Sequence, residues 1–251
     1  MQKLFEDKNT CSFRMTVNAR TLTLTDLRQR FGVRFNASDR FFEDWLVQVL
    51  PVSETESVAL ERIRQNYEYL SQEEPPLEEV VKLVVVSPLL DLSGFYQPPF
   101  LIKAEVSTTI KVADDPNTPP IIGKIDVLVV QESLWVLVIE SKPARLDVTA
   151  GIAQALTYLL SAPTSQNTLY GMVTNGREVL FLRLERGIQP PQYSRSSTYR
   201  LLENVQERQQ VLQGLKQIGA CIQTAAHPDN CRDQKKSAPT ITKTTAPPTT
   251  A

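Results

Sequence analysis

Two short apolar segments, residues 121–130 and 134–142, constrain the fold of this chain more than any other feature. Each has the length of a strand and is rich in valine, leucine and isoleucine. Nearly continuous apolar runs of this length are typical of strands that are buried on both faces of a sheet. We therefore expect a central sheet with helices on both of its sides.

Patterns elsewhere in the chain predict what surrounds these two strands. Apolar residues recur at helical spacing in segments 53–71, 77–86, 147–160 and 201–222. Further strands are predicted at 101–112, 168–174 and 178–184. The second helix is expected to end before Pro88, because proline disfavours the helical conformation of the residue in front of it. This order predicts an α/β sandwich with a central mixed sheet flanked by helices.

Composition and patterning together predict how the chain is organised. We expect an N-terminal helical extension over residues 1–76, a core domain over 77–223 and a disordered tail over 224–251. The tail is rich in threonine, proline and alanine and has little apolar content. Lys and Arg total 27 and Asp and Glu total 28, which argues against a strongly basic protein that coats nucleic acid.

Residue usage argues against several classes of chemistry. The one histidine, His227, lies in the predicted tail, which disfavours a Ser-His-Asp triad or a histidine-rich metal site. Cys11, Cys221 and Cys231 lack the spacing of a metal site or a disulfide framework. No glycine-rich nucleotide-binding loop is present. Because there is no apolar run of about 18 residues and no signal-peptide core, we expect a soluble cytoplasmic protein without membrane contact.

Charged residues interrupt the two apolar strands, among them Asp126, Glu140 and Lys142. A buried charge is unfavourable unless it is paired or binds a metal ion. A symmetric hairpin centred on Ser133 places Asp126 directly opposite Glu140 on one face of the sheet. Lys142, two residues beyond Glu140, shares that face. We therefore expect the three side chains to lie together at the ends of two central strands.

Two carboxylates beside a lysine suit metal-assisted cleavage of a phosphodiester. Carboxylate oxygens are ligands for Mg²⁺, which also keeps water and substrate phosphate in its coordination shell. The metal acidifies a bound water and stabilises charge on the phosphate. A neighbouring ammonium group can orient that water or neutralise the transition state.

The same residues carry a resemblance to a known family. Asp126 and the tripeptide 140–142, Glu-Ser-Lys, resemble the motif of the PD-(D/E)XK nuclease superfamily, although isoleucine stands where that motif has proline. Gln154 and Tyr158 follow on the next predicted helix as Q-x-x-x-Y. The combination is similar to the nuclease domain of type I restriction enzyme R subunits and of RecB-type nucleases. The similar region spans residues 77–184.

This resemblance implies a restriction-endonuclease-like fold and Mg²⁺-dependent endonuclease activity on DNA, with Mn²⁺ as a plausible substitute. It implies that Asp126 and Glu140 bind the metal and that Lys142 assists the attacking water. Gln154 and Tyr158, four residues apart on one helix face, are implied to position the site or to contact the DNA backbone. The implied partners are DNA and a targeting or restriction-system protein. The sequence lacks the P-loop translocase of full R subunits, and the oligomeric state stays open.

Nucleases of this kind usually take a further carboxylate from an early helix. Glu79 is the first candidate metal ligand, because Leu83 and Val86 continue its helix face toward the interior. Glu78 is the second candidate and Glu105, on the strand at 101–112, is the third. Both helix acids can also be first-turn residues that complement the helix dipole.

Other interpretations of these residues stay open. Glu140 can form a structural ion pair with Lys142 or Lys124. The chain can be a non-catalytic DNA-binding or assembly module on a nuclease scaffold, or an α/β protein with a chance motif. The arginine-rich segment 171–200 suits a DNA backbone but equally suits a solvated surface.

Overall fold

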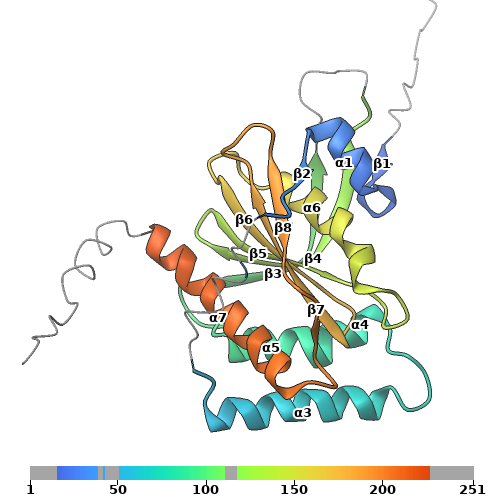
Figure 1. Ribbon diagram of the computed structural model, residues 1–251, viewed down its shortest axis with the longest axis vertical. Helices are drawn as coiled ribbons and strands as arrows, with labels where there is room; N and C mark the ends of the chain where they lie inside the picture. Colours follow the sequence, from blue (N-terminus) through green and yellow to red (C-terminus); the bar gives the residue numbers. More distant parts are fainter. Residues whose placement is uncertain (1–15, 39–41, 43–50, 111–117, 227–251) are drawn as a thin grey trace, which may run out of the picture.

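The chain folds into an α/β sandwich, in which a mixed sheet runs through the centre and helices cover both of its faces (Figure 1). The computed structural model describes residues 16–38, 42, 51–110 and 118–226. The fold class predicted from the sequence is therefore confirmed.

Nine strands of the described residues form one sheet. They are β1 (Val17–Asn18), β2 (Arg34–Phe35), β3 (Leu101–Ile110), β4 (Ile121–Gln131), β5 (Leu134–Ser141), β6 (Thr168–Thr174), β7 (Glu178–Glu185), β8 (Gln192–Arg195) and β9 (Tyr199–Arg200). The order across the sheet is β1-β4-β5-β6-β7-β8-β2, while β3 also pairs with β4 and β9 with β7. β5 and β6 are parallel, whereas β4 and β7 are antiparallel to these neighbours, so the sheet is mixed.

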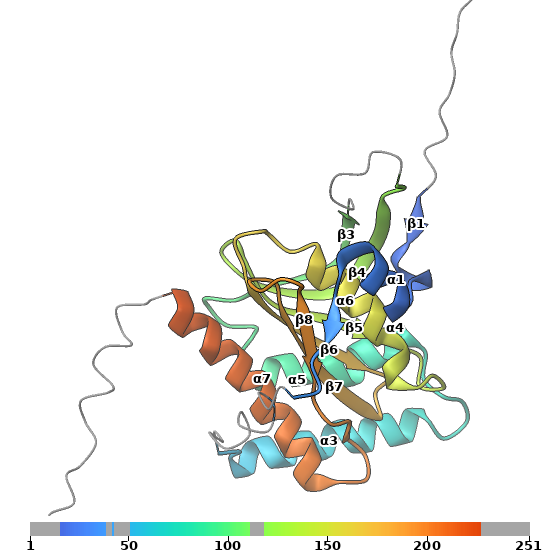
Figure 2. The same ribbon diagram turned by 45° about the horizontal axis from the view of Figure 1, so that its top comes forward.

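Helices form a layer on each side of this sheet. The α-helices are α1 (Leu24–Phe31), α3 (Glu54–Leu70), α4 (Glu78–Val81), α5 (Ser87–Leu92), α6 (Ile152–Leu160) and α7 (Val205–Ala226). Two 3₁₀ turns, η1 (Ala19–Thr21) and η3 (Val148–Gly151), and one π-helical segment, η2 (Lys82–Val86), join them. α1 and α6 lie on one side, and α3, α5 and α7 lie on the other (Figures 1 and 2).

Each layer has its own apolar core. Leu60, Val85 and Leu215 belong to the core between the sheet and the α3–α5–α7 layer. Leu27 and Leu156 belong to the core under α1 and α6. The strands contribute to both cores because alternate side chains point to opposite faces. This double burial explains why the central strands have nearly continuous apolar sequences.

The hairpin of β4 and β5 has the register that the candidate site requires. Leu128 pairs with Val138, and the ladder continues outward toward Asp126 and Glu140. The predicted turn centred on Ser133 is wrong in detail.

The turn is one residue tighter than predicted, because Gln131 pairs with Leu134 across residues 132–133. A register shift between Val129 and Val130 follows. Such a bulge adds one residue to one strand. It compensates for the tighter turn, so the register beyond Val129 equals the predicted one.

The helix predicted at 77–86 does not end before Pro88, and this expectation is wrong. α4, η2 and α5 follow one another without a break from Glu78 to Leu92. The Ser87 N–H donates to the carbonyl of Lys82, five residues earlier, as in a π-helix. The wider π turn accommodates the ring and the missing donor of Pro88, which a regular α-helical turn does not.

The N-terminal segment differs from the helical extension predicted over residues 1–76. β1 pairs in parallel with β4, and β2 pairs in parallel with β8, so this segment also contributes strands to the central sheet. β1 and β2 have two residues each, which is too short for either strand to be delimited by a periodic pattern. The boundary at residue 76 stays a prediction.

The chain's C-terminal region is described only in part. α7 ends at Ala226, and the rest of the tail predicted over 224–251 lies outside the described residues. In the part of the chain that the structure describes, no helix combines the length and the apolar character needed to cross a membrane.

Candidate active site at an opening in the sheet

An opening along one edge of β4 creates the site. On the edge opposite β3, β1 pairs with Ile121 and Ile122, and β5 pairs from Val127 onward. Among the described strands, none pairs with residues 123–126 on this edge. Asp126 therefore lies where β4 and β5 separate, and side chains from both helical layers reach this point.

Asp126 and Glu140 are neighbouring buried carboxylates beside this unpaired stretch, 3% and 0% exposed. The Ser141 N–H donates to Asp126 Oδ2 at 2.7 Å. Burial raises the pKa of Asp126 to about 6. Burial, with repulsion from Asp126, raises the pKa of Glu140 to about 8. At pH 7 the pair therefore holds about one proton.

Lys142 directly follows β5, and its side chain is held beside Glu140 by two acceptors. Its Nζ donates to Glu140 Oε1 at 2.7 Å and to Gln154 Oε1 at 2.6 Å. The other carboxylate oxygen, Glu140 Oε2, is buried and has no hydrogen-bond partner among the described residues. The ammonium group is thus fixed beside a carboxylate that has one oxygen available.

Gln154 and Tyr158 extend this arrangement from α6 to the unpaired stretch of β4. The Gln154 side-chain amide donates to the Tyr158 hydroxyl at 2.8 Å. The same hydroxyl accepts the backbone N–H of Lys124 at 3.3 Å. Gln154 is 3% exposed and Tyr158 is 0% exposed. The resemblance implied that Gln154 and Tyr158 either position the site or contact DNA. In the structure Gln154 contacts Lys142, and Tyr158 contacts Gln154.

The early helix brings Glu78, rather than Glu79, toward the two carboxylates. The Glu78 carboxylate lies 3.7 Å from Lys82 Nζ. Burial is the main cause of the raised pKa values of Asp126 and Glu140, and the negative charge of Glu78 raises both further. Glu79 is exposed, and no contact in the described region joins it to either carboxylate. The preference for Glu79 is thus corrected, because α4 turns residue 78 toward the sheet.

Lys82 is a member of the site that the sequence analysis missed. Its Nζ lies 2.9 Å from Glu105 Oε1 and 3.7 Å from Asp126 Oδ1. Burial lowers its pKa, but the hydrogen bond to Glu105 and the charge of Asp126 outweigh burial and raise it. The signal available in the sequence was its spacing of four residues from Glu78 on one helix.

Glu105, the third candidate acid, is engaged by lysines on the rim of the site. Hydrogen bonds from Lys124 and Lys82 lower the pKa of Glu105. Its backbone has φ +57°, in the left-handed region, between the pairs that Ala104 and Val106 make with β4. This distortion lies opposite the position of Asp126 in the ladder.

The available donors fit a hard divalent cation with few protein ligands. Asp126 and Glu140 offer carboxylate oxygens, and Glu140 Oε2 lacks any other partner in the described structure. No three histidine, cysteine, aspartate or glutamate side chains of the described residues are arranged to hold a metal ion together. Mg²⁺ accepts such a site, because it commonly binds one or two carboxylates and completes its shell with water and phosphate.

Most arginines of the basic segment 171–200 serve the fold. Arg186 donates to main-chain carbonyls after α6, including Ala162 O at 3.0 Å. Arg200 donates to Glu207 Oε1 at 2.6 Å. Ion pairs also engage Arg177 with Glu203 and Arg183 with Glu185. The predicted basic flank is therefore largely neutralised within the chain.

Twelve chains of solved structures match this chain, and two of them show how limited the similarity is. No family model and no curated protein matches the chain. A fragment described as an HsdR subunit of a type I restriction enzyme from Vibrio vulnificus YJ016 is 22% identical, with a TM-score of 0.34. The match covers 53% of this chain but 25% of that one.

A phage-related exonuclease from Haemophilus somnus 129PT is 10% identical, with a TM-score of 0.27, over 84% of this chain and 97% of that one. At these values neither match establishes a family or an activity for this chain.

Proposed function

We propose that this protein is a Mg²⁺-dependent deoxyribonuclease that hydrolyses phosphodiester bonds as a restriction-type endonuclease of the PD-(D/E)XK kind. One observation carries the proposal. Two buried carboxylates, Asp126 and Glu140, meet a fixed ammonium group, Lys142, at an opening in the sheet, and Glu140 Oε2 has no partner within the described residues. A purely structural ion pair needs neither a second buried acid nor an unpaired oxygen.

In this proposal Asp126 and Glu140 hold the metal, and Glu78 adds negative charge beside them. When bound, the metal acidifies a water and offsets charge on the phosphate. Mn²⁺ fits the same oxygen donors. A bound cation would also offset the burial and the mutual repulsion that keep a proton on the carboxylate pair.

Lys142 acts on the reacting phosphate through its free donor. An ammonium group has three N–H donors, and two are used by Glu140 Oε1 and Gln154 Oε1. The third can point to the attacking water or to a phosphate oxygen. A charged donor already in place stabilises the transition state without reorganisation. Gln154 and Tyr158 are positioning residues, because they reach the site only through Lys142 and the Lys124 N–H.

DNA is the proposed substrate, and a restriction-system or other targeting protein is the proposed partner. The described site contains carboxylates and lysines that suit a metal ion and one phosphate group. It contains no group of side chains arranged to contact the edges of bases. Sequence choice would therefore come from other parts of an assembly.

A cleavage assay tests the function. Purified protein is incubated with supercoiled plasmid, linear duplex and single-stranded DNA in Mg²⁺, Mn²⁺ or EDTA. We expect metal-dependent cleavage that falls at least about 100-fold in Asp126→Asn and in Lys142→Met, since removing one stabilising donor from an active site typically has this effect. Lys103→Met is the matched control, because Lys103 is exposed on β3 and makes no described ion pair.

Two outcomes overturn the function. One is folded wild type that cleaves none of the three DNAs with either metal. The other is Lys142→Met that cleaves at the rate of the Lys103→Met control. Metal-independent DNA binding that survives Glu140→Gln, without cleavage, would instead support a non-catalytic module on this scaffold.

A further inference from the structure

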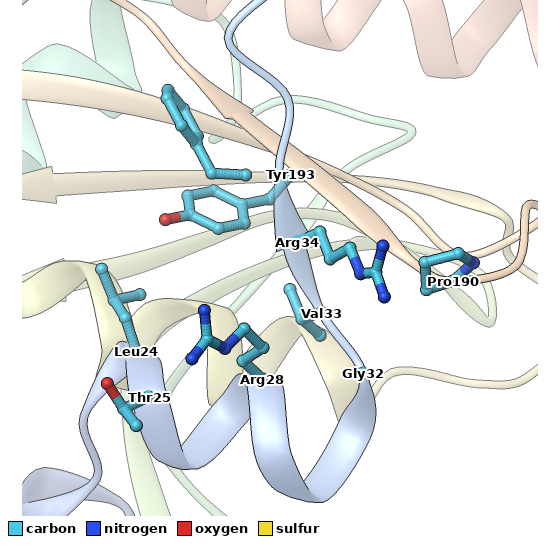
Figure 3. Close-up of a pocket in the computed structure, with 9 residues that line it drawn as sticks. Leu24, Thr25, Arg28, Gly32, Val33, Arg34, Pro190 and Tyr193 are labelled. Atoms are coloured by element: carbon cyan, nitrogen blue, oxygen red, sulfur yellow. The ribbon is translucent and has the colours of Figure 1, made fainter.

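A cavity lies between α1 and the edge strands β2 and β8, and it contains none of the residues of the candidate active site. Its volume is about 750 Å³. Figure 3 shows Arg28 on α1, Arg34 on β2 and Tyr193 on β8 around it. Phe35 also lines it. The cavity therefore combines two guanidinium groups with two aromatic rings.

Local structure explains how this cavity forms. α1 ends at Phe31 and is capped by Gly32, which adopts φ +69°, a left-handed conformation that glycine tolerates best. The chain reverses there and enters β2, which pairs Arg34 with Gln192 and Phe35 with Tyr193. The helix and the strand thereby form two walls of the cavity.

One ring of the aromatic pair, Phe35, is exposed. Phe35 is 51% exposed on the edge strand, although burying a phenylalanine ring is worth about 1.5–3 kcal/mol. Its ring centroid lies 5.2 Å from that of Tyr193, with the planes 46° apart. Tyr193 is 9% exposed, so the buried ring of this pair contacts the exposed one. One face of an aromatic platform is thus presented to solvent beside the arginines.

The two arginines are free to bind an anion. Arg28 and Arg34 are both exposed, and no carboxylate within the described ranges lies at ion-pair distance from either. Among the described residues that line the cavity, none is acidic. Arg183, Arg186 and Arg200, in contrast, all have partners in the fold. Unpaired guanidinium groups match phosphate geometry and bind it through two parallel hydrogen bonds.

We propose that this cavity binds single-stranded nucleic acid, with a base stacked on Phe35 and flanking phosphates on Arg28 and Arg34. Aromatic platforms beside positive charge are the usual means of binding single strands without sequence preference. A duplex suits the site less well, because its bases stack on each other and do not offer a free face. The proposal goes beyond the nuclease proposal and does not depend on it, since the two sites share no residue.

Binding is measured by fluorescence anisotropy of a 5′-fluorescein-labelled oligo-dT 12-mer in EDTA, so that no metal-dependent step contributes. We expect Phe35→Ala to weaken binding about 10-fold, as loss of one stacking contact typically does, and Phe35→Trp to restore it. Arg28→Ala/Arg34→Ala should reduce the slope of log K against log salt by about 1.4, because each phosphate contact on a single strand contributes about 0.7. Arg62→Ala/Tyr69→Ala, on the exposed face of α3, is the matched control.

The proposal is overturned if Phe35→Ala binds as tightly as wild type while its melting curve is unchanged. It is also overturned if unlabelled duplex competes as well as the unlabelled single strand, or if inorganic phosphate alone displaces the probe at similar concentration. Wild type that binds the oligonucleotide here but cleaves no DNA would refute the nuclease proposal alone.

Discussion

Tyr158→Phe is the most informative single change, because it removes one oxygen from the buried network and adds no bulk. The Tyr158 hydroxyl accepts hydrogen bonds from the Gln154 amide at 2.8 Å and from the Lys124 N–H at 3.3 Å. Phenylalanine keeps the ring, which is completely buried. Two donors then lose their acceptor, and one of them, Gln154, also holds Lys142.

The expected magnitude follows from these two donors. An unsatisfied buried polar group costs about 1–3 kcal/mol. The Gln154 amide is buried, whereas the Lys124 N–H is part-buried and can form a hydrogen bond with water instead. We therefore expect the free energy of unfolding to fall by about 2–3 kcal/mol. For a domain of this size each kcal/mol lowers Tm by about 2–4 °C, so the expected shift is roughly 5–10 °C.

Urea titration and thermal melting measure this loss, with Tyr69→Phe as the control. Tyr69 is 71% exposed and its hydroxyl makes no hydrogen bond in the described structure, so this hydroxyl should contribute less than about 0.5 kcal/mol. If the variant also cleaves DNA, kcat should fall more than KM changes, because Lys142 loses a positioning contact. Equal stability of Tyr158→Phe and Tyr69→Phe would refute the role given to the Gln154–Tyr158 network.

Three further predictions concern stability. Gly176→Ala should lose at least about 2 kcal/mol by urea titration, because φ is +84° and a Cβ there would lie 2.4 Å from Tyr67 Cε2; a wild-type midpoint would contradict this. Arg186→Ala should lower the free energy of unfolding by about 2 kcal/mol, because several main-chain carbonyls after α6 lose their hydrogen-bond donor. An unchanged Tm would show that Arg186 does not stabilise this turn. Burial raises the pKa of Asp126 to about 6 and of Glu140 to about 8, above their unfolded values. The contribution of these two groups to the free energy of unfolding is therefore fully present below about pH 4. It is lost as pH rises through 6 and 8, at up to about 1.4 kcal/mol per pH unit for each group. Urea midpoints measured in EDTA should fall from pH 5.5 to 8 more steeply in wild type than in Glu140→Gln. Equal slopes of midpoint against pH in the two proteins would refute the raised pKa values.

The sequence is most informative about the central hairpin and the elements beside it. Apolar runs interrupted by Asp126 and Glu140 indicate both the strands and the buried acids, because burial on two faces leaves few polar positions. The register survives an error in the turn, since the bulge near Val130 offsets the missing turn residue. The spacing of Gln154 and Tyr158 places both side chains on one face of α6.

Features that depend on tertiary contacts are not visible in the sequence. The π turn before Pro88 overrides the local preference of proline, and only the packed structure shows it. The choice between Glu78 and Glu79 depends on the rotation of α4, which the sheet determines. β2 has two residues, too few for a periodic pattern, so neither its pairing nor the cavity beside Arg34 could be predicted.

Calorimetric titration of the metal-free protein with Mn²⁺ tests the central claim most directly, namely that Asp126 and Glu140 can together hold a divalent cation. We expect saturable binding with proton release at pH 7, because the carboxylate pair must ionise fully. Asp126→Asn should weaken binding at least 10-fold, whereas Glu74→Gln, at an exposed position, should not. Folded wild type that binds neither Mn²⁺ nor Mg²⁺, or Asp126→Asn that binds as tightly as wild type, would contradict the account.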